Sequence, residues 1–451
     1  MQIRIGRAVK ELRKQTERRN FKALRATLSE LVHYFETGSS TSDLHTARTT
    51  GLLKFVAESA TAVSCGWPVR IQSLALRLAS CLMQGAQENR ASILCSNVLL
   101  EVVPSLTTAL DADENEGEEE AHLQEASGKN GKPAATGPPL ELMLSIAVLS
   151  LSSSIERYNQ VTRDTIGFMI CSGIIHVISD HFSLFNSPHA GAPFPASVEK
   201  SLALLEVLTH PGNKEFGAQE AGPITDHLMS AMRDTSLVGL PSVMTAALLH
   251  ASSPSSADIN SANLPSNFIV VAESIMRVLN NCACHDLSLT QEIMTAPDLR
   301  VELVHLVSFL LTFCTSQWDV NPRQIKGLLN EALLLTGHFA VLHTANQGVL
   351  HWGKSPTILK KLCALPFPYF CDPALQAVLL PTFLAVSYSN ASNSKVIGAE
   401  VDLGIVLRYL RQIVREAPAA NGAAVSRFHL SRRFPRALFS DAVEWLEGHR
   451  D

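Results

Sequence analysis

The amino-acid sequence contains almost no sign of β-structure. No segment alternates apolar and polar residues over the length of a strand, and no Asn-Gly turn joins two apolar runs. Aromatic residues make up only 6% of the chain and charged residues 18%, whereas 46% are hydrophobic. This balance excludes global disorder, because the chain has enough apolar surface to bury a large core. The sequence therefore predicts a folded, all-α protein.

Catalytic motifs are sparse. The dinucleotide-binding pattern GxGxxG and the GxSxG elbow of serine hydrolases do not occur. We expect no nucleotide chemistry, no cofactor and no catalytic residue. An alternative remains open, in which a helical enzyme builds its site from histidine and carboxylate side chains of distant segments, since a sequence does not show which residues converge.

Secretory and membrane signals are missing as well. The nine cysteines are spread from Cys65 to Cys371 without the dense spacing of a disulfide framework, so we expect reduced, buried thiols in a cytosolic protein. No apolar stretch follows the basic residues at the N-terminus. The longest apolar windows, 140–155 and 299–315, are diluted by serines or interrupted by charged residues. We therefore expect no segment that spans a membrane.

Two groups of residues resemble metal sites without completing one. Cys282, Cys284 and His285 offer three ligands within four positions, but zinc needs four and no second pair lies nearby. His338 and His343 are five positions apart and do not form HExxH. We expect a helix end with Cys282 in the core, histidines in structural positions, and no metal.

The N-terminal 37 residues predict one long basic helix. Their apolar positions fall near helical spacing, and the segment contains no proline. Between positions 4 and 25 the chain has nine basic residues and two acids. We call these nine residues the N-terminal basic surface and expect them to contact polyanion phosphates: Arg4, Arg7, Lys10, Arg13, Lys14, Arg18, Arg19, Lys22 and Arg25. Because the first half of the helix has few apolar residues, we expect it to project from the body; the alternative is a solvated face without a ligand.

The remainder predicts an irregular α-solenoid of the armadillo or HEAT type. Residues 44–110 form a first helical layer, 140–450 the rest, and the acidic segment 111–139 a disordered loop. Helical patterns recur with short gaps and without a consensus repeat, at 44–64, 67–85, 89–110, 140–159, 160–182, 197–210, 222–234, 236–251, 265–284, 298–315, 322–345, 355–364, 372–389, 394–416 and 432–447. The helix 298–315 is apolar almost all round, which predicts an inner, buried position.

Basic residues gather again near the C-terminus. On the predicted helix 394–416, Arg408, Arg411 and Arg415 share a stripe opposite apolar residues, and a further group follows. We call the following residues the C-terminal basic cluster, a second candidate for polyanion contact: Arg408, Arg411, Arg415, Arg432, Arg433 and Arg436. Arg427 lies near this group in the sequence.

Three segments carry a family resemblance: ANQGVLHWG at 345–353, SPTILKKLCALPFPYFCDP at 355–373 and VLLPTFLA at 378–385. They resemble the C-terminal helical region of the S phase cyclin A-associated protein in the endoplasmic reticulum family, whose ending is similar to RRFPRALFSDA at 432–442. Prolines should stop one helix and start the next here, with aromatic side chains filling the corner. The family-like corner comprises Pro366, Phe367, Tyr369, Phe370, Asp372 and Pro373.

The resemblance implies a scaffold or adaptor. Its implied partners are cyclin A, a tetratricopeptide-repeat factor that senses nascent tubulin, a deadenylase complex and ribosomal RNA. Its implied roles are ribosome-associated mRNA decay and cell-cycle regulation, in the cytoplasm or at the periphery of the endoplasmic reticulum. The upstream coiled-coil and zinc-finger segments of longer members are not visible in this sequence, so the chain is either a compact member or a fragment. The alternative function is a structural role at the cytoskeletal or mitotic apparatus without RNA contact.

Overall fold

All regular structure in the computed structural model is helical. It describes residues 2–61, 66–102, 104–106, 140–152, 159–184, 192–213, 222–251, 264–416 and 426–449, and these contain no strand. The expected all-α, solenoid-like fold is confirmed. The segment 111–139, expected to be a disordered loop, lies outside the described residues.

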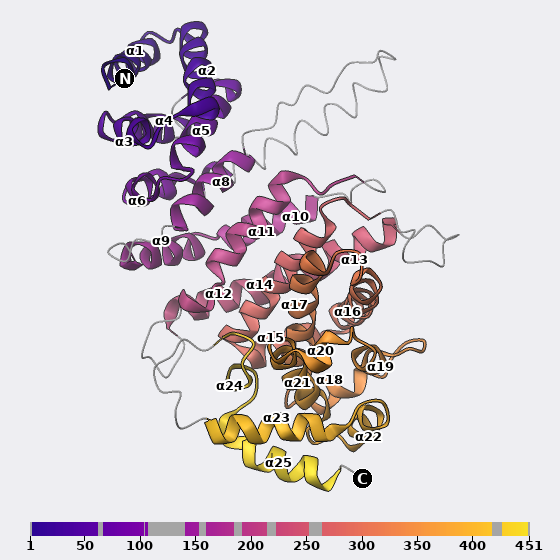
Figure 1. The fold of residues 1–451 in the computed structure, drawn as a ribbon. Coiled ribbons are helices and arrows are strands. Elements are labelled where there is room, and N and C mark those ends of the chain that lie inside the picture. Colours follow the sequence, from indigo (N-terminus) through magenta and orange to yellow (C-terminus); the bar gives the residue numbers. More distant parts are fainter. Residues whose placement is uncertain are drawn as a thin grey trace, which may run out of the picture. The chain divides into compact units, whose positions relative to one another are not determined.

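The chain divides into two compact units. Unit 1 comprises Met1–Phe185 and Pro195–Ala231, and unit 2 comprises Asn186–Phe194 and Met232–Asp451. The helices of unit 1 (Figure 1) are α1 (Gln2–Glu17), α2 (Phe21–Gly38), α3 (Thr41–Thr49), α4 (Leu52–Thr61), α5 (Val69–Met83), α6 (Gln87–Leu94), α8 (Leu140–Leu151), α9 (Asn159–Cys171), α10 (Ile174–Leu184), α11 (Ala196–Leu208) and the start of α12 (Pro223–Asp234).

Unit 1 is a stack in which α2, α5, α8 and α11 pack successively on one another, although other helices lie between them in the sequence. Helix α5 also packs on α4, its neighbour in the chain. Leu28 of α2, Leu76 of α5 and Leu205 of α11 are completely buried. Because each helix buries its apolar face against the next, the stack has the one-dimensional organisation of a solenoid.

The expected single helix over 1–37 is wrong, because the chain turns between α1 and α2. Arg19 has a positive φ of 50°, and the side chain of Asn20 accepts a hydrogen bond from Ala23 N at 3.2 Å, which caps α2. The expected projection is also wrong. Helix α1 packs against α2, α3 and α4, and three residues at helical spacing, Ile5, Val9 and Leu12, suffice to bury one of its faces.

Unit 2 contains two rows of helices. Its elements are α13 (Leu240–Ala251), α14 (Phe268–His285), α15 (Leu287–Thr295), α16 (Pro297–Gln317), α17 (Pro322–Ala340), α18 (Thr344–Val349), α19 (Ile358–Cys363), α20 (Pro368–Cys371), α21 (Pro373–Ser387), α22 (Ala391–Glu400), α23 (Leu403–Glu416), α24 (Leu430–Arg433) and α25 (Phe439–Gly448). In one row, α17 packs on α14 and α21. In the other row, α16 packs on α13 and α19, and α19 packs on α22. The contact between α16 and α17 joins the two rows. Helices α23 and α25 lie side by side at the C-terminal end (Figure 1).

Helix α16 is less enclosed than its composition suggests. It packs against α13, α15, α17 and α19, but Val301 remains 47% exposed. By length and hydropathy alone α16 could cross a membrane, and 44% of its apolar window is buried inside the unit. A partly buried core helix passes the same test of length and hydropathy, and α16 packs as one, so the expectation that no segment spans a membrane is not contradicted by α16.

Prolines shape the family-like corner as expected. Helix α19 ends at Cys363, Pro368 begins α20, and Pro373 begins α21, which Asp372 caps by accepting from Ala374 N at 2.7 Å. The aromatic residues do not all fill the corner. Tyr369 is buried against Trp318, whereas the Phe367 side chain is 76% exposed.

A buried carboxylate organises the row of α14, α17 and α21. Glu331 of α17 is only 4% exposed, and its Oε2 accepts hydrogen bonds from Asn280 Nδ2 at 2.9 Å and Arg427 Nη2 at 2.7 Å. Arg277 Nε lies 3.6 Å from the other carboxylate oxygen. Burial raises the pKa of Glu331, while Arg427, Asn280 and Arg277 counteract that shift by stabilising the charged form.

A second buried group lies beside this carboxylate. The Nδ1 atom of His338 lies 3.2 Å from Asn280 Oδ1, an acceptor, so Nδ1 carries the proton. Arg433 donates to Val378 O at 2.6 Å and to the hydroxyl of Thr382. Burial lowers the pKa of His338 to about 3, with further lowering by the nearby arginines, and burial lowers the pKa of Arg433 to about 9. The expected structural role of His338 is confirmed by its burial.

Gly337 leaves the space that the Arg433 guanidinium occupies. A Cβ at this position would lie 2.6 Å from Arg433 Nη2. We predict that Gly337→Ala lowers the free energy of unfolding by about 2 kcal/mol, because the guanidinium cannot move without losing its buried acceptors. Gly348→Ala is the matched control, since nothing lies within 4 Å of its Cβ and alanine favours a helix. Equal urea midpoints for the two variants would contradict the prediction.

The low pKa of His338 predicts a pH dependence of stability. The folded pKa is about 3 and the ordinary value is 6.5, so between them the unfolded chain binds the extra proton. The contribution of His338 to the free energy of unfolding is therefore fully present above pH 6.5. Below that pH it decreases, by up to about 1.4 kcal/mol per pH unit. Glu331, with its raised pKa, contributes the opposite slope.

Urea titrations from neutral pH to about pH 4 test this prediction. In the His338→Gln variant, the free energy of unfolding should decrease less as the pH is lowered. His305→Gln, at an exposed position of α16, should behave like the unmodified protein. If the free energy of unfolding of His338→Gln changed with pH as steeply as that of the unmodified protein, His338 would not be the group that takes up the proton.

Candidate polyanion-binding surface

The N-terminal basic surface is exposed along its whole length. All nine residues have exposed side chains, on α1, on the turn after it and on the first turns of α2: Arg4, Arg7, Lys10, Arg13, Lys14, Arg18, Arg19, Lys22 and Arg25. The packing of α1 explains this arrangement, since Ile5, Val9 and Leu12 occupy its buried side and the basic residues of α1 lie on the other sides. The sequence predicted this exposure although it misplaced the helix boundaries.

Few acidic groups neutralise this surface. Within its described residues the only ion pair joins Lys14 Nζ to Glu11 Oε2, at 3.9 Å. Arg13 is placed over the ring of Phe55, with its guanidinium carbon 5.7 Å from the ring centroid. The other cations of the surface have no acidic partner among the described residues. Such a concentration of uncompensated charge creates a positive potential that attracts anions.

The C-terminal basic cluster differs, because two of its six arginines are paired with acids and a third is buried. The expected helix 394–416 is interrupted between α22 and α23, where Asp402 Oδ1 accepts from Gly404 N at 2.7 Å. Arg408 lies 3.8 Å from Asp402, and Arg411 is ion-paired with Glu447 of α25. Arg415 is exposed, so the predicted exposed stripe of α23 is confirmed, but two of its three arginines have acidic partners.

Arg433 does not belong to a surface at all. It was expected to contact a polyanion, yet it is 4% exposed and its guanidinium is committed to Val378 and Thr382. Arg432 and Arg436 are exposed, and Arg427 is half-buried on Glu331. The prediction failed because one turn, α24, directs neighbouring arginines to opposite sides, a difference that charge alone does not reveal. The cluster is therefore not a continuous surface.

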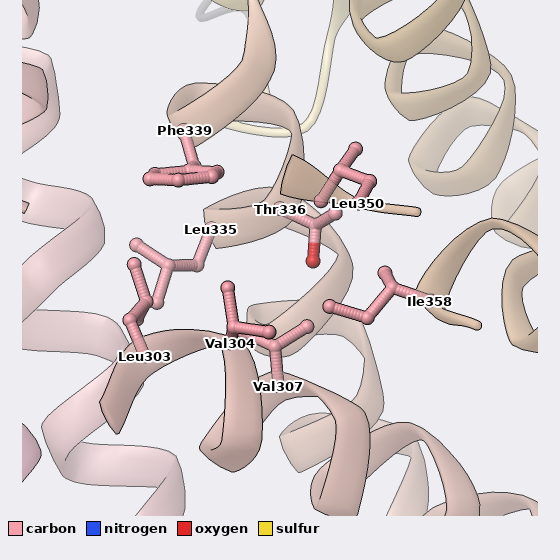
Figure 2. Close-up of a pocket in the computed structure, with 8 residues that line it drawn as sticks. All are labelled: Leu303, Val304, Val307, Leu335, Thr336, Phe339, Leu350 and Ile358. Carbon is pink, nitrogen blue, oxygen red and sulfur yellow. The ribbon is translucent and has the colours of Figure 1, made fainter. Parts of the chain in front are cut away.

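A small apolar cavity lies between α16, α17 and α19 (Figure 2). Its lining contains no titratable group: Leu303, Val304, Val307, Leu335, Thr336, Phe339, Leu350 and Ile358. The Thr336 hydroxyl donates to Ala332 O at 2.7 Å, which satisfies the one polar side chain of the lining. This cavity offers no acid, base or nucleophile.

The histidine and cysteine candidates occupy separate positions. Cys282 is buried, as expected, and burial raises the pKa of its thiol to about 12. His343 caps α18 by accepting from Asn346 N at 3.2 Å. No group of three His, Cys, Asp or Glu residues in the described part of the chain is placed to hold a metal ion. The cysteines are not uniformly buried, because Cys95, Cys171 and Cys371 are exposed.

One motif escaped the sequence analysis. Residues 348–355, GVLHWGKS, match the letters of the phosphate-binding GxxxxGK[ST] loop. The structural context of that motif is absent, because the segment begins in the last two residues of the short helix α18 instead of after a strand, and it precedes the six-residue helix α19. The contact of Glu331 with Asn280 and Arg277 was also not predicted. These three polar residues lie within apolar helical segments, and that pattern could have indicated a buried polar group.

Comparison with known proteins agrees with the resemblance found in the sequence. No protein-family model matches the chain. A solved structure of an engineered protein covers 98% of this chain and 99% of its own, at 12% identity and a TM-score of 0.40, which is too low to support an argument. Human S phase cyclin A-associated protein in the endoplasmic reticulum is 29% identical over 231 residues, which are 49% of this chain. The chain is thus similar to that protein over about half of its own length, and spans 16% of the length of that relative.

Proposed function

We propose that this chain is a non-catalytic helical scaffold that binds protein partners and docks on a polyanion through the N-terminal basic surface. The exposed and mostly unpaired cations of α1 and α2 carry the polyanion part of the proposal. Each phosphate that such a cation neutralises releases counterions and adds affinity. The stacked helices support the protein-binding part, because solenoids expose long continuous surfaces.

Ribosomal RNA is the polyanion that we favour. The human relative is named for its association with cyclin A and for the endoplasmic reticulum, which supports a protein-binding role close to that organelle. On the family resemblance we extend the proposal to ribosome-associated control of mRNA decay, with a tubulin-sensing tetratricopeptide-repeat factor and a deadenylase complex as further partners. The phosphates of ribosomal RNA would then face α1 and α2, while other surfaces of the chain hold the proteins.

Neutralising the N-terminal basic surface should weaken ribosome binding and its salt dependence. The variant changes Arg4, Arg7, Lys10, Arg18, Lys22 and Arg25 to Gln; it leaves Arg13 on Phe55 and Arg19 in its positive-φ turn. Co-sedimentation with purified ribosomes over a salt series should show a log–log slope reduced by about 0.7 to 0.9 for each phosphate that the variant no longer neutralises.

The matched control changes exposed cations of the C-terminal cluster, Arg415, Arg432 and Arg436, to Gln. It should retain most of the binding, because these residues lie among compensated arginines. An unchanged slope in the N-terminal variant would remove the RNA interaction from the proposal. Cyclin or tubulin binding that persists at high salt in that variant would instead favour the structural cytoskeletal role.

A further inference from the structure

Residues 426–434 place Leu430, Arg433 and Phe434 in the core of unit 2 and half-bury Arg427 on Glu331. The only regular element in this described segment is the single turn α24, which packs on α21. The anchors recur at positions 427, 430, 433 and 434, whereas Arg432 between them is exposed.

The position that receives Arg427 is organised by residues outside the segment. Asn280 holds Glu331 Oε2, and Arg277 approaches the other oxygen. Arg277 is itself ion-paired with Glu273, whose carboxylate occupies space that Gly327 leaves open, since a Cβ there would lie 2.7 Å from Glu273 Oε2. Residues of α14 and α17 therefore hold the carboxylate together with Arg427, and they belong to the body that receives the segment.

A second position fits the Arg433 guanidinium. Its wall is formed by Gly337 of α17, and its acceptors are Val378 O and the Thr382 hydroxyl of α21. Thr382 in turn donates to Leu333 O at 2.9 Å, which fixes its oxygen toward the arginine. A larger residue than glycine at position 337 would fill this position.

Two apolar anchors complete the contact. Leu430 is completely buried, and Phe434 is 2% exposed with its ring edge-on to Tyr388, at 5.2 Å between centroids. Polar and apolar positions thus alternate along the groove. Such a pattern recognises both charge and shape.

We propose that α14, α17 and α21 form a peptide-binding groove for the sequence Arg-x-x-Leu-x-x-Arg-Phe, and that residues 426–434 occupy it as an exchangeable intramolecular ligand. We call this segment the clasp. A buried ion pair stabilises a fold little better than packed apolar residues of the same volume, but it selects its partner strictly. Without Arg427, Glu331 would keep only Asn280 and the longer contact with Arg277 in a largely buried position, so an open groove favours a basic occupant. This inference does not depend on RNA binding, because no residue of the N-terminal basic surface takes part.

Peptide exchange on the cleaved protein tests the groove. A protease site is placed between residues 416 and 426 of the full chain, the purified protein is cut, and a fluorescent peptide of residues 426–451 is added. Polarisation should report saturable exchange with the resident fragment. Peptides with Arg427→Gln or Arg433→Gln should bind about tenfold more weakly or worse, because each lacks a charged hydrogen-bond donor to a buried acceptor.

The Arg432→Gln peptide is the matched control and should bind within about twofold of the unmodified peptide, because Arg432 is exposed beside the buried Arg433. In the Glu331→Gln protein, the Arg427→Gln peptide should lose much less affinity than in the unmodified protein. If Glu331→Gln fails to fold, the peptide series alone still decides. Equal affinities of all three peptides, or a fragment that leaves only when circular dichroism shows unfolding, would overturn the proposal.

Discussion

The buried carboxylate of Glu331 is the constraint on which unit 2 depends. Taking a carboxylate out of water costs several kcal/mol, and attraction to a cation offsets this only when the remaining oxygens are hydrogen-bonded. Asn280 and Arg277 of α14 and Arg427 of the C-terminal segment supply those partners. One side chain of α17 therefore requires an adjacent helix and a segment almost 100 positions later to be in place together. Leucine at the same position would have required only a neighbouring apolar surface.

Arginine serves two different purposes in this chain. On α1 and α2 the basic groups are exposed, and a polyanion would respond to their summed positive potential more than to any individual position. At Arg433 the guanidinium is buried against Val378 and Thr382, and its geometry matters more than its charge. A lysine could replace most residues of the first group. It could not make both contacts of Arg433, because its ammonium is a single point on a flexible chain.

The helical class and the exposure of the N-terminal cations were predictable from the sequence, because both follow from spacing and composition. Helix breaks were less predictable. The turn at Arg19 and Asn20 depends on one side-chain cap and one positive φ, and neither disturbs the apolar periodicity on which the prediction of a single helix rested. The direction of Arg433 depends on the turn α24 and on the space at Gly337, which lies far away in the sequence. Such long-range fits are set by tertiary packing, which one sequence does not display.

Under the two proposals, the two kinds of basic group would give two kinds of recognition that operate under different conditions. Attraction of a polyanion to the N-terminal basic surface is long-range and weakens as salt screens it, since the Debye length falls from about 10 Å at 0.1 M to about 3 Å at 1 M. Contact with Glu331 is buried and is screened far less. A scaffold with both can approach a charged surface quickly and still select a particular peptide, because electrostatic steering sets encounter rates whereas buried polar matches set dissociation. The two surfaces lie in different compact units, the N-terminal basic surface in unit 1 and the Glu331 site in unit 2.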